Sequence, residues 1–177
     1  HRIPSQRECL QCHQSGVLGF TALQLSADPH LPRDPSSLDL RALEASGRLT
    51  HPYTSQPRIP ARSELEAKAV GYLAVNCASC HATSGYASFT RLWFDIDPAA
   101  ASFHQLSIAR TAVSRPSGYP IPGQGSGSQR IAPRNPGRSS VLFRLSSELP
   151  GQRMPSLGSV VADRQGVALI SDWIRGL

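Results

Sequence analysis

Two segments of the chain carry apolar residues at the spacing of an amphipathic helix. The first follows a capping-box pattern, in which Ser63 is the expected N-cap and Glu66 occupies the third helical position. Its expected buried face consists of Leu65, Ala69, Tyr72, Leu73 and Asn76. The pattern predicts a helix that leads into the hexapeptide NCASCH (76–81).

The second segment closes the chain. Asp163 is the expected N-cap of this helix, and its apolar stripe consists of Val167, Ile170, Trp173, Ile174 and Leu177. Two shorter helices are predicted over residues 37–49 and 139–147. Residues 91–97, RLWFDID, alternate enough for a short strand or an extended segment. The expected elements are therefore mainly helical.

The composition adds long connections to these helices. The 177 residues include 15 prolines and 14 glycines, and the stretch 115–139 contains too many of them for regular structure. Hydrophobic residues make up 40% of the chain, which is enough for a core. We therefore expect a mostly α-helical fold with long loops.

The charge narrows the choice of partners. The net charge of +6 comes from 17 arginines and a single lysine against 12 acidic residues. There is no dense basic run with interleaved aromatic residues, so nucleic acid is not an expected partner, whereas an acidic protein would fit. No run approaches the roughly 18 apolar residues of a membrane span. No signal peptide is visible, and the opening HRIPSQREC has the character of a processed start or of a piece of a longer chain.

The four cysteines occur as two copies of the motif CxxCH, CLQCH (9–13) and CASCH (77–81). A structural zinc site has its second CxxC within roughly 12 to 20 residues of the first, whereas 64 residues separate these two. Local disulfides would be strained or redox-active, and a thioredoxin-like motif would occur once. None of these three hypotheses explains a histidine at the same offset twice.

Covalent haem attachment explains the whole motif, because CxxCH is the signature of c-type haem. Two thiols one helical turn apart lie on the same side and can form thioethers with the two vinyl groups of one porphyrin. The next residue then places an imidazole to bind the iron. We therefore expect two haem c groups, attached through Cys9 and Cys12 and through Cys77 and Cys80, with His13 and His81 as proximal iron ligands.

The single methionine of the chain is the expected sixth ligand of the second haem. Met154 stands in RMPSLG (153–158), a proline-stiffened loop just before the closing helix. The competing hypothesis is that Met154 only fills a gap in the core. Because Met/His ligation raises the reduction potential relative to bis-histidine ligation, the second haem is expected to be the higher-potential site.

No methionine is left for the first haem, so its sixth ligand is expected to be a histidine. His51, which follows the helix predicted over 37–49, is the first candidate. His30, on a proline-flanked loop before that helix, is the second. His104, His1, a ligand from a neighbouring chain or an open coordination site would also fit.

The motifs predict two cytochrome c-like haem-binding units, residues 1–60 and 61–177, or alternatively one compact diheme module. The loop 115–139 is either disordered or wraps a haem edge. In the second case Arg130, Arg134 or Arg138 would lie near the haem propionates, because arginine pairs bidentately with carboxylates. Trp93 is expected in the core or against a haem.

Four stretches make the chain resemble a family of largely uncharacterised bacterial diheme c-type cytochrome modules. They are CLQCH…LGFTALQLS (9–26), AVGYLAVNCASCH (69–81), IAPRNPGRSSVLFRLSS (131–147) and RMPSLGSVVADRQGVALISDWI (153–174), and together they run from end to end. The resemblance implies an exported, redox-active module with His13, His81 and Met154 as ligands. In this family the module is often the C-terminal part of a longer chain, sometimes beside a quinoprotein-dehydrogenase-like propeller. Some relatives have a histidine about where Ala45 stands, which implies that the first haem's sixth ligand has been relocated here.

These features predict a protein that passes single electrons between redox partner proteins. It would drain a dehydrogenase or serve as one unit of a conductive extracellular chain of cytochromes. The rival hypothesis is an enzyme, a diheme peroxidase, which needs an open or displaceable sixth position and nearby acid–base groups. The sequence offers no convincing distal Glu/His set for that chemistry. Because c-type maturation takes place outside the cytoplasm, we expect the protein in the periplasm or outside the cell.

Overall fold

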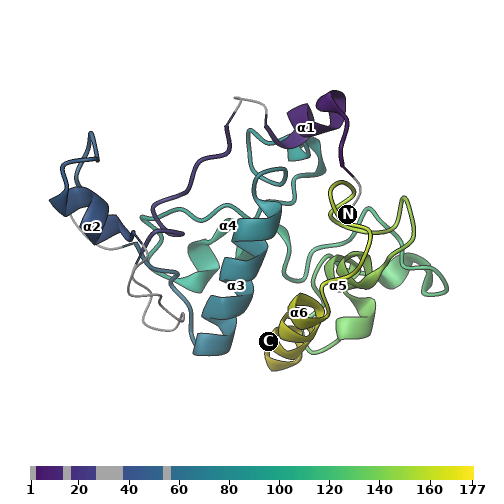
Figure 1. Cartoon of the computed structure of the whole chain (residues 1–177). Helices are drawn as coiled ribbons and strands as arrows, with labels where there is room; N and C mark the ends of the chain where they lie inside the picture. The colour runs from purple at the N-terminus through teal and green to yellow at the C-terminus, as the bar shows by residue number, and fades with distance from the viewer. Residues whose placement is uncertain (1–2, 14–16, 27–37, 54–56) are drawn as a thin grey trace.

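The computed structural model describes residues 3–13, 17–26, 38–53 and 57–177. The predictions for His1, His30 and the start of the helix over 37–49 lie outside these residues. The fold is mostly helical with long loops: helices make up 40% of the structure, and the described residues contain no β-strand. Their α-helices are α1 (Gln6–Cys12), α2 (Leu40–Ala45), α3 (Glu64–Cys77), α4 (Ser107–Thr111), α5 (Ser140–Ser146) and α6 (Arg164–Gly176) (Figure 1). Short 3₁₀ turns occupy η1 (Ser88–Thr90), η2 (Phe103–Gln105), η3 (Gly125–Gly127) and η4 (Pro136–Arg138).

Helix α3 begins where the sequence predicts it. The Ser63 hydroxyl accepts a hydrogen bond from the backbone N–H of Glu66 at 3.1 Å, as an N-cap should. The Glu66 carboxylate, however, accepts from the backbone N–H of Arg62 at 2.8 Å and from Trp173 Nε1 of α6 at 3.3 Å. Glu66 therefore ties the start of α3 to α6 instead of completing the capping box.

The buried face of α3 is rotated from the predicted one. Its buried side chains are Glu66, Ala69, Val70 and Leu73. The prediction is wrong for Leu65 and Asn76, because both are exposed. A charged residue takes the inner position since Arg62 and Trp173 satisfy its carboxylate, a tertiary effect that apolar periodicity does not report.

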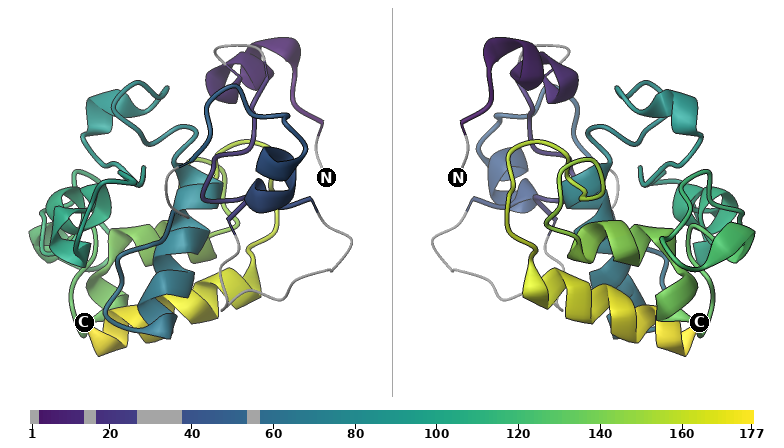
Figure 2. Two further views of the ribbon diagram at one scale, coloured as in Figure 1. Left: turned by 90° about the vertical axis from the view of Figure 1, so that its left-hand side faces the viewer. Right: turned by 90° about the vertical axis from the view of Figure 1, so that its right-hand side faces the viewer.

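The prediction for the closing helix is confirmed. The Asp163 carboxylate caps α6 by accepting from the N–H groups of Gln165 and Gly166 at 3.0 and 3.1 Å. The buried stripe of α6 contains Ile170, Trp173 and Ile174. This stripe packs against both α3 and α5, and Figure 2 shows α6 crossing the lower end of α3.

The residues of the hydrophobic core come from the part of the chain that begins with α3 and ends with α6. Its buried members are Ala69, Val70, Leu73, Phe94, Phe103, Leu106, Ile108, Ala112, Ile131, Leu142, Leu145, Ile170, Trp173 and Ile174. The predicted helix over 139–147 is confirmed as α5, which contributes two of these residues. In the N-terminal part Leu40 is buried, whereas Val17 and Phe20 are exposed. The division into units 1–60 and 61–177 stays a prediction.

The N-terminal helices α1 and α2 are short. Ser5 and Glu8 form a capping box that begins α1, with the carboxylate of Glu8 accepting from the Ser5 N–H at 2.8 Å. Asp39 caps α2 by accepting from the Ala42 N–H at 2.8 Å. Helix α2 is shorter than predicted, because the chain turns at Gly47, whose φ of 67° lies in the left-handed region.

The long loops contain little regular secondary structure, as their composition predicts. Residues 91–97 have no regular secondary structure. The stretch 115–139 is ordered, because isolated backbone bridges join Pro116 to Gln129 and Gln129 to Ser139. Within the described part of the chain, no helix combines the length and the hydropathy needed to cross a bilayer.

Candidate functional site

The second CxxCH motif continues the last turn of α3. Cys77 is the final helical residue, and its carbonyl oxygen accepts from the N–H groups of Cys80 and His81 at 3.1 and 2.8 Å. The two thiols and the imidazole therefore belong to one hydrogen-bonded turn. The His81 carbonyl oxygen then accepts from the Phe94 N–H at 2.8 Å, which anchors this turn to the core.

The His81 ring is oriented through one of its two nitrogens. Its Nδ1 lies 3.2 Å from the carbonyl oxygen of Leu92, and a carbonyl can only accept, so Nδ1 carries the proton. The edge of the ring also contacts Phe94, with centroids 5.7 Å apart. Nε2 therefore keeps its lone pair, the state that an imidazole needs in order to bind a metal.

The surroundings of His81 favour the neutral ring. Burial lowers the pKa of His81, and the nearby positive charges of Arg144 and Arg130 lower it further, against an opposing contribution from the Leu92 hydrogen bond. A neutral imidazole is the form that binds metals, so these groups favour His81 as a candidate metal ligand.

The first motif lies on α1, which Figure 1 shows above the C-terminal end of α3. Cys9 is exposed, whereas Cys12 and His13 are partly buried. The Sγ atom of Cys12 lies 3.3 Å from the Sγ atom of Cys80. The fold thus brings the two motifs into direct contact, although they are 68 positions apart in sequence.

Two thiols of the motifs, those of Cys12 and Cys77, are held protonated near neutral pH. Burial raises the pKa of Cys12 to about 11, and the adjacent Cys80 contributes to the rise. Burial likewise raises the pKa of Cys77 to about 12. Among the described residues, no three histidine, cysteine or carboxylate side chains gather in a metal-binding arrangement.

Two arginines place positive charge beside His81. Arg130 donates to the carbonyl oxygens of Thr90 and Thr111, each at 2.7 Å, and to that of Arg91 at 2.5 Å. The Arg144 guanidinium lies over the Tyr119 ring, 4.3 Å from its centroid. Of the three arginines predicted near propionates, only Arg130 is one whose charge lowers the pKa of His81. Arg144 has the same effect, and the sequence did not predict it.

Three buried polar atoms in the described residues have no hydrogen-bond partner: Trp93 Nε1, Asp95 Oδ1 and Arg153 Nε. Trp93 follows Leu92, the residue that orients His81, and Arg153 precedes Met154. An unpaired buried donor costs stability unless a ligand supplies an acceptor. The carboxylates of a haem are acceptors of that kind, so these two donors fit the group that the CxxCH motifs imply.

Met154 is connected to the His81 region through α5. Its backbone N–H donates to the Arg144 carbonyl oxygen at 2.8 Å, and Arg144 Nε donates to the Gln152 carbonyl oxygen at 2.9 Å. The loop that carries Met154 is therefore fastened to the arginine whose charge acts on His81. Its role as an iron ligand stays a prediction.

The histidine candidates for the first haem are placed only in part. His51 is exposed after α2, and His104 is exposed on η2, where its ring contacts Phe103 with centroids 5.9 Å apart. The sixth ligand of the first haem stays open among the predicted candidates.

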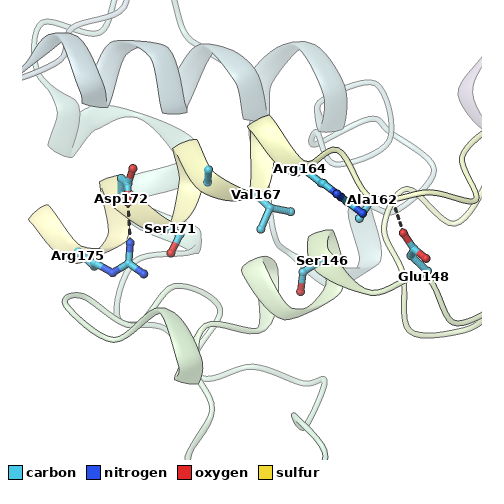
Figure 3. Close-up of a pocket in the computed structure, with 9 residues that line it drawn as sticks. Ser146, Glu148, Ala162, Arg164, Val167, Ser171, Asp172 and Arg175 are labelled. Carbon is cyan, nitrogen blue, oxygen red and sulfur yellow. Dashed lines mark hydrogen bonds and ion pairs between the residues drawn. The ribbon is translucent and has the colours of Figure 1, made fainter.

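A shallow depression of about 470 Å³ lies between α5 and α6 (Figure 3). Its lining includes two polar pairs: Arg175 bonds Asp172 at 2.6 Å, and Glu148 accepts from the Ala162 N–H at 3.2 Å. None of the predicted cysteine, histidine or methionine site residues lines it. This depression is therefore separate from the CxxCH contact.

Comparison with protein-family models, with curated proteins and with solved structures gave no match. Sequence reasoning predicted the cysteines and His81 as site residues, which stays a prediction. It did not point to Leu92 and Arg144, which the structure places in contact with His81 or near it. The sequence could not point to Leu92, because Leu92 contacts His81 through its backbone carbonyl, which every residue has. Arg144 left a weak signal, as a lone charge within the apolar run VLFRL (141–145).

Proposed function

We propose that this protein is a diheme c-type cytochrome that transfers single electrons between redox partners. The observation that carries the proposal is the His81 turn. Two cysteines and a neutral histidine occupy one turn, and the Leu92 carbonyl fixes the tautomer that leaves Nε2 available. Chemistry that needs thiols alone has no use for such an imidazole.

Each motif would hold one haem, attached through Cys9 and Cys12 or through Cys77 and Cys80, with His13 and His81 on the iron. Bound haem supplies reversible one-electron chemistry at its iron. Met154 is the proposed sixth ligand at His81. Trp93 and Arg153 would donate hydrogen bonds to propionates, and Arg130 would contribute a fixed positive charge.

The contact between Cys12 and Cys80 supports two haems that are neighbours. The Sγ atoms of the two motifs are 3.3 Å apart, so groups attached at both lie at adjoining edges. Adjacent haems pass electrons directly, which suits a carrier between a donor and an acceptor. We favour electron transfer over the diheme peroxidase because the sequence offers no convincing distal Glu/His set for peroxide chemistry.

The proposed role places the protein in the periplasm or outside the cell, where c-type maturation occurs. Its net charge of +6 favours an acidic redox partner. As a module it would drain a dehydrogenase, consistent with the family resemblance, or join other copies in a chain of cytochromes. Negative-stain microscopy separates these roles, since discrete particles alone would rule out the filament.

Denaturing mass spectrometry of protein matured in a host that attaches haem c tests the proposal. The expected mass is that of the polypeptide plus two haems. The variant Cys77→Ala/Cys80→Ala should retain one haem, and the matched variant Cys9→Ala/Cys12→Ala should retain the other. The bare polypeptide mass in all three samples would overturn the proposed function. High-spin iron at rest with peroxide turnover would favour the peroxidase.

A further inference from the structure

The contact between Cys12 and Cys80 also allows a reaction other than haem attachment, namely the formation of a disulfide bond. Cys12 lies at the end of α1, Cys80 lies just beyond α3, and both are partly buried free thiols. Their Sγ atoms are 3.3 Å apart. A disulfide bond is about 2.05 Å long, so an approach of roughly 1.3 Å would bring them to bonding distance.

Within each motif, a backbone hydrogen bond closes the turn that carries the two cysteines. The Cys9 carbonyl accepts from the His13 N–H at 2.9 Å, and the Cys77 carbonyl accepts from the Cys80 N–H at 3.1 Å. Each CxxC is thus one hydrogen-bonded turn. A bond inside it would close a small ring across that turn, whereas the pair between the motifs joins two separate segments.

We propose that the folded, haem-free chain is oxidised at this pair, forming a Cys12–Cys80 disulfide and leaving Cys9 and Cys77 as thiols. The oxidant is a disulfide of the protein or small-molecule class. Its S–S bond breaks as the new one forms, the two cysteine sulfurs lose two electrons, and their protons go to the two released thiols. An oxidising compartment supplies such reagents.

The consequence rests on the proposed function, although the disulfide itself does not. Each CxxCH motif would lose one of its two thiols, so the oxidised chain could form only one thioether at each site. Complete attachment of both haems would then require prior reduction of this single bond. The bond would act as a redox checkpoint on maturation.

The test uses the full chain produced without haem attachment and incubated with glutathione disulfide in native buffer. Remaining thiols are alkylated in denaturant, and a non-reducing digest is mapped by mass spectrometry. We expect a cross-linked peptide pair that contains Cys12 and Cys80, with Cys9 and Cys77 alkylated. Because folding supplies the proximity, the Cys12–Cys80 pair should dominate the cross-links in native buffer and should lose this dominance in denaturant.

Two serine variants sharpen the result. Cys12→Ser should abolish the cross-link, whereas Cys9→Ser, one helical turn away, should leave it intact. Dominant bonding within either CxxC, or the same mixture of pairings with and without denaturant, would overturn the proposal. The readout involves no haem, so it stands or falls independently of the haem mass that tests the proposed function.

Discussion

The Nδ1 atom of His81 lies 3.2 Å from the carbonyl oxygen of Leu92, eleven residues further along the chain. This hydrogen bond fixes which nitrogen carries the proton and how the ring is turned. When a histidine binds a metal through Nε2, a hydrogen bond donated by its Nδ1–H raises the basicity of Nε2 toward the metal. The folded polypeptide thus prepares the histidine through a backbone group.

If the proposed haem ligation is correct, Met154→Ala should change only the iron bound by His81. Loss of a thioether ligand is expected to remove the methionine–iron charge-transfer band and to lower the potential of one haem, because methionine ligation raises it. Visible spectroscopy and a redox titration measure both effects. Leu157→Ala in the same loop is the control, and an unchanged band in Met154→Ala would contradict the assignment.

His51→Ala tests the first candidate for the other iron. If His51 is the sixth ligand, its removal should convert one low-spin haem to a high-spin form in low-temperature EPR. His104→Ala is measured in parallel, because His104 is also exposed and is a candidate for the same position. Unchanged spectra for His51→Ala would contradict its assignment, and a high-spin form in His104→Ala alone would assign His104 instead.

Arg130→Gln should lower the potential of the haem at His81. A positive charge near the iron disfavours the oxidised state, so its removal stabilises that state by on the order of tens of millivolts. Arg134→Gln is the control, because Arg134 is exposed and was also predicted near the propionates. Equal shifts in both variants would mean that net charge, rather than position, is responsible. Thermal unfolding should accompany the titration, because Arg130 also donates to three carbonyls.

Glu66→Gln should lower the free energy of unfolding near neutral pH by about 1–3 kcal/mol. Larger losses are not expected, because Arg62 is half-exposed and water screens its charge. Burial alone would raise the pKa of Glu66, but hydrogen bonds from Arg62 and Trp173 outweigh it, and the net pKa is lowered. A lowered folded pKa means that its stabilisation is full above the unfolded pKa and is lost as the pH falls through the folded pKa.

Urea unfolding of the parent and of Glu66→Gln, measured from neutral pH into the acid range, checks this prediction. The gap between the two free energies of unfolding should narrow as the pH falls. Lys68→Gln is the control for an exposed pair, since Lys68 pairs with Glu64 on the surface. A gap that stays constant with pH would show that the loss comes from the changed hydrogen bonding of the amide rather than from the carboxylate charge.

Local signals predicted the helices, and tertiary contacts decided the rest. Ser63 and Asp163 mark the starts of α3 and α6 because an N-cap acts on the next turn of the same helix. The inner face of α3 depends on Trp173 of α6, which reaches Glu66 from 107 positions away. Periodicity therefore misplaced Leu65 on the buried side.

The candidate site divides in the same way. The CxxCH motifs are short enough to identify by spacing, so their cysteines and histidines are visible in the sequence. The approach of Cys12 to Cys80 comes from the packing of α1 over the end of α3, which no local pattern encodes. Among three arginines of one loop, only the fold shows that Arg130 is turned toward the Thr90 carbonyl.

The three hydrogen bonds that hold the Arg130 side chain would affect the rate of the proposed electron transfer. A guanidinium whose donors are already engaged with three carbonyl oxygens has little freedom to reorient when a charge beside it changes. Polar groups that stay in place keep the reorganisation energy of a redox centre small. The charges around a redox centre at His81 would therefore need little rearrangement when an electron arrives, and electron transfer to and from that centre would be fast.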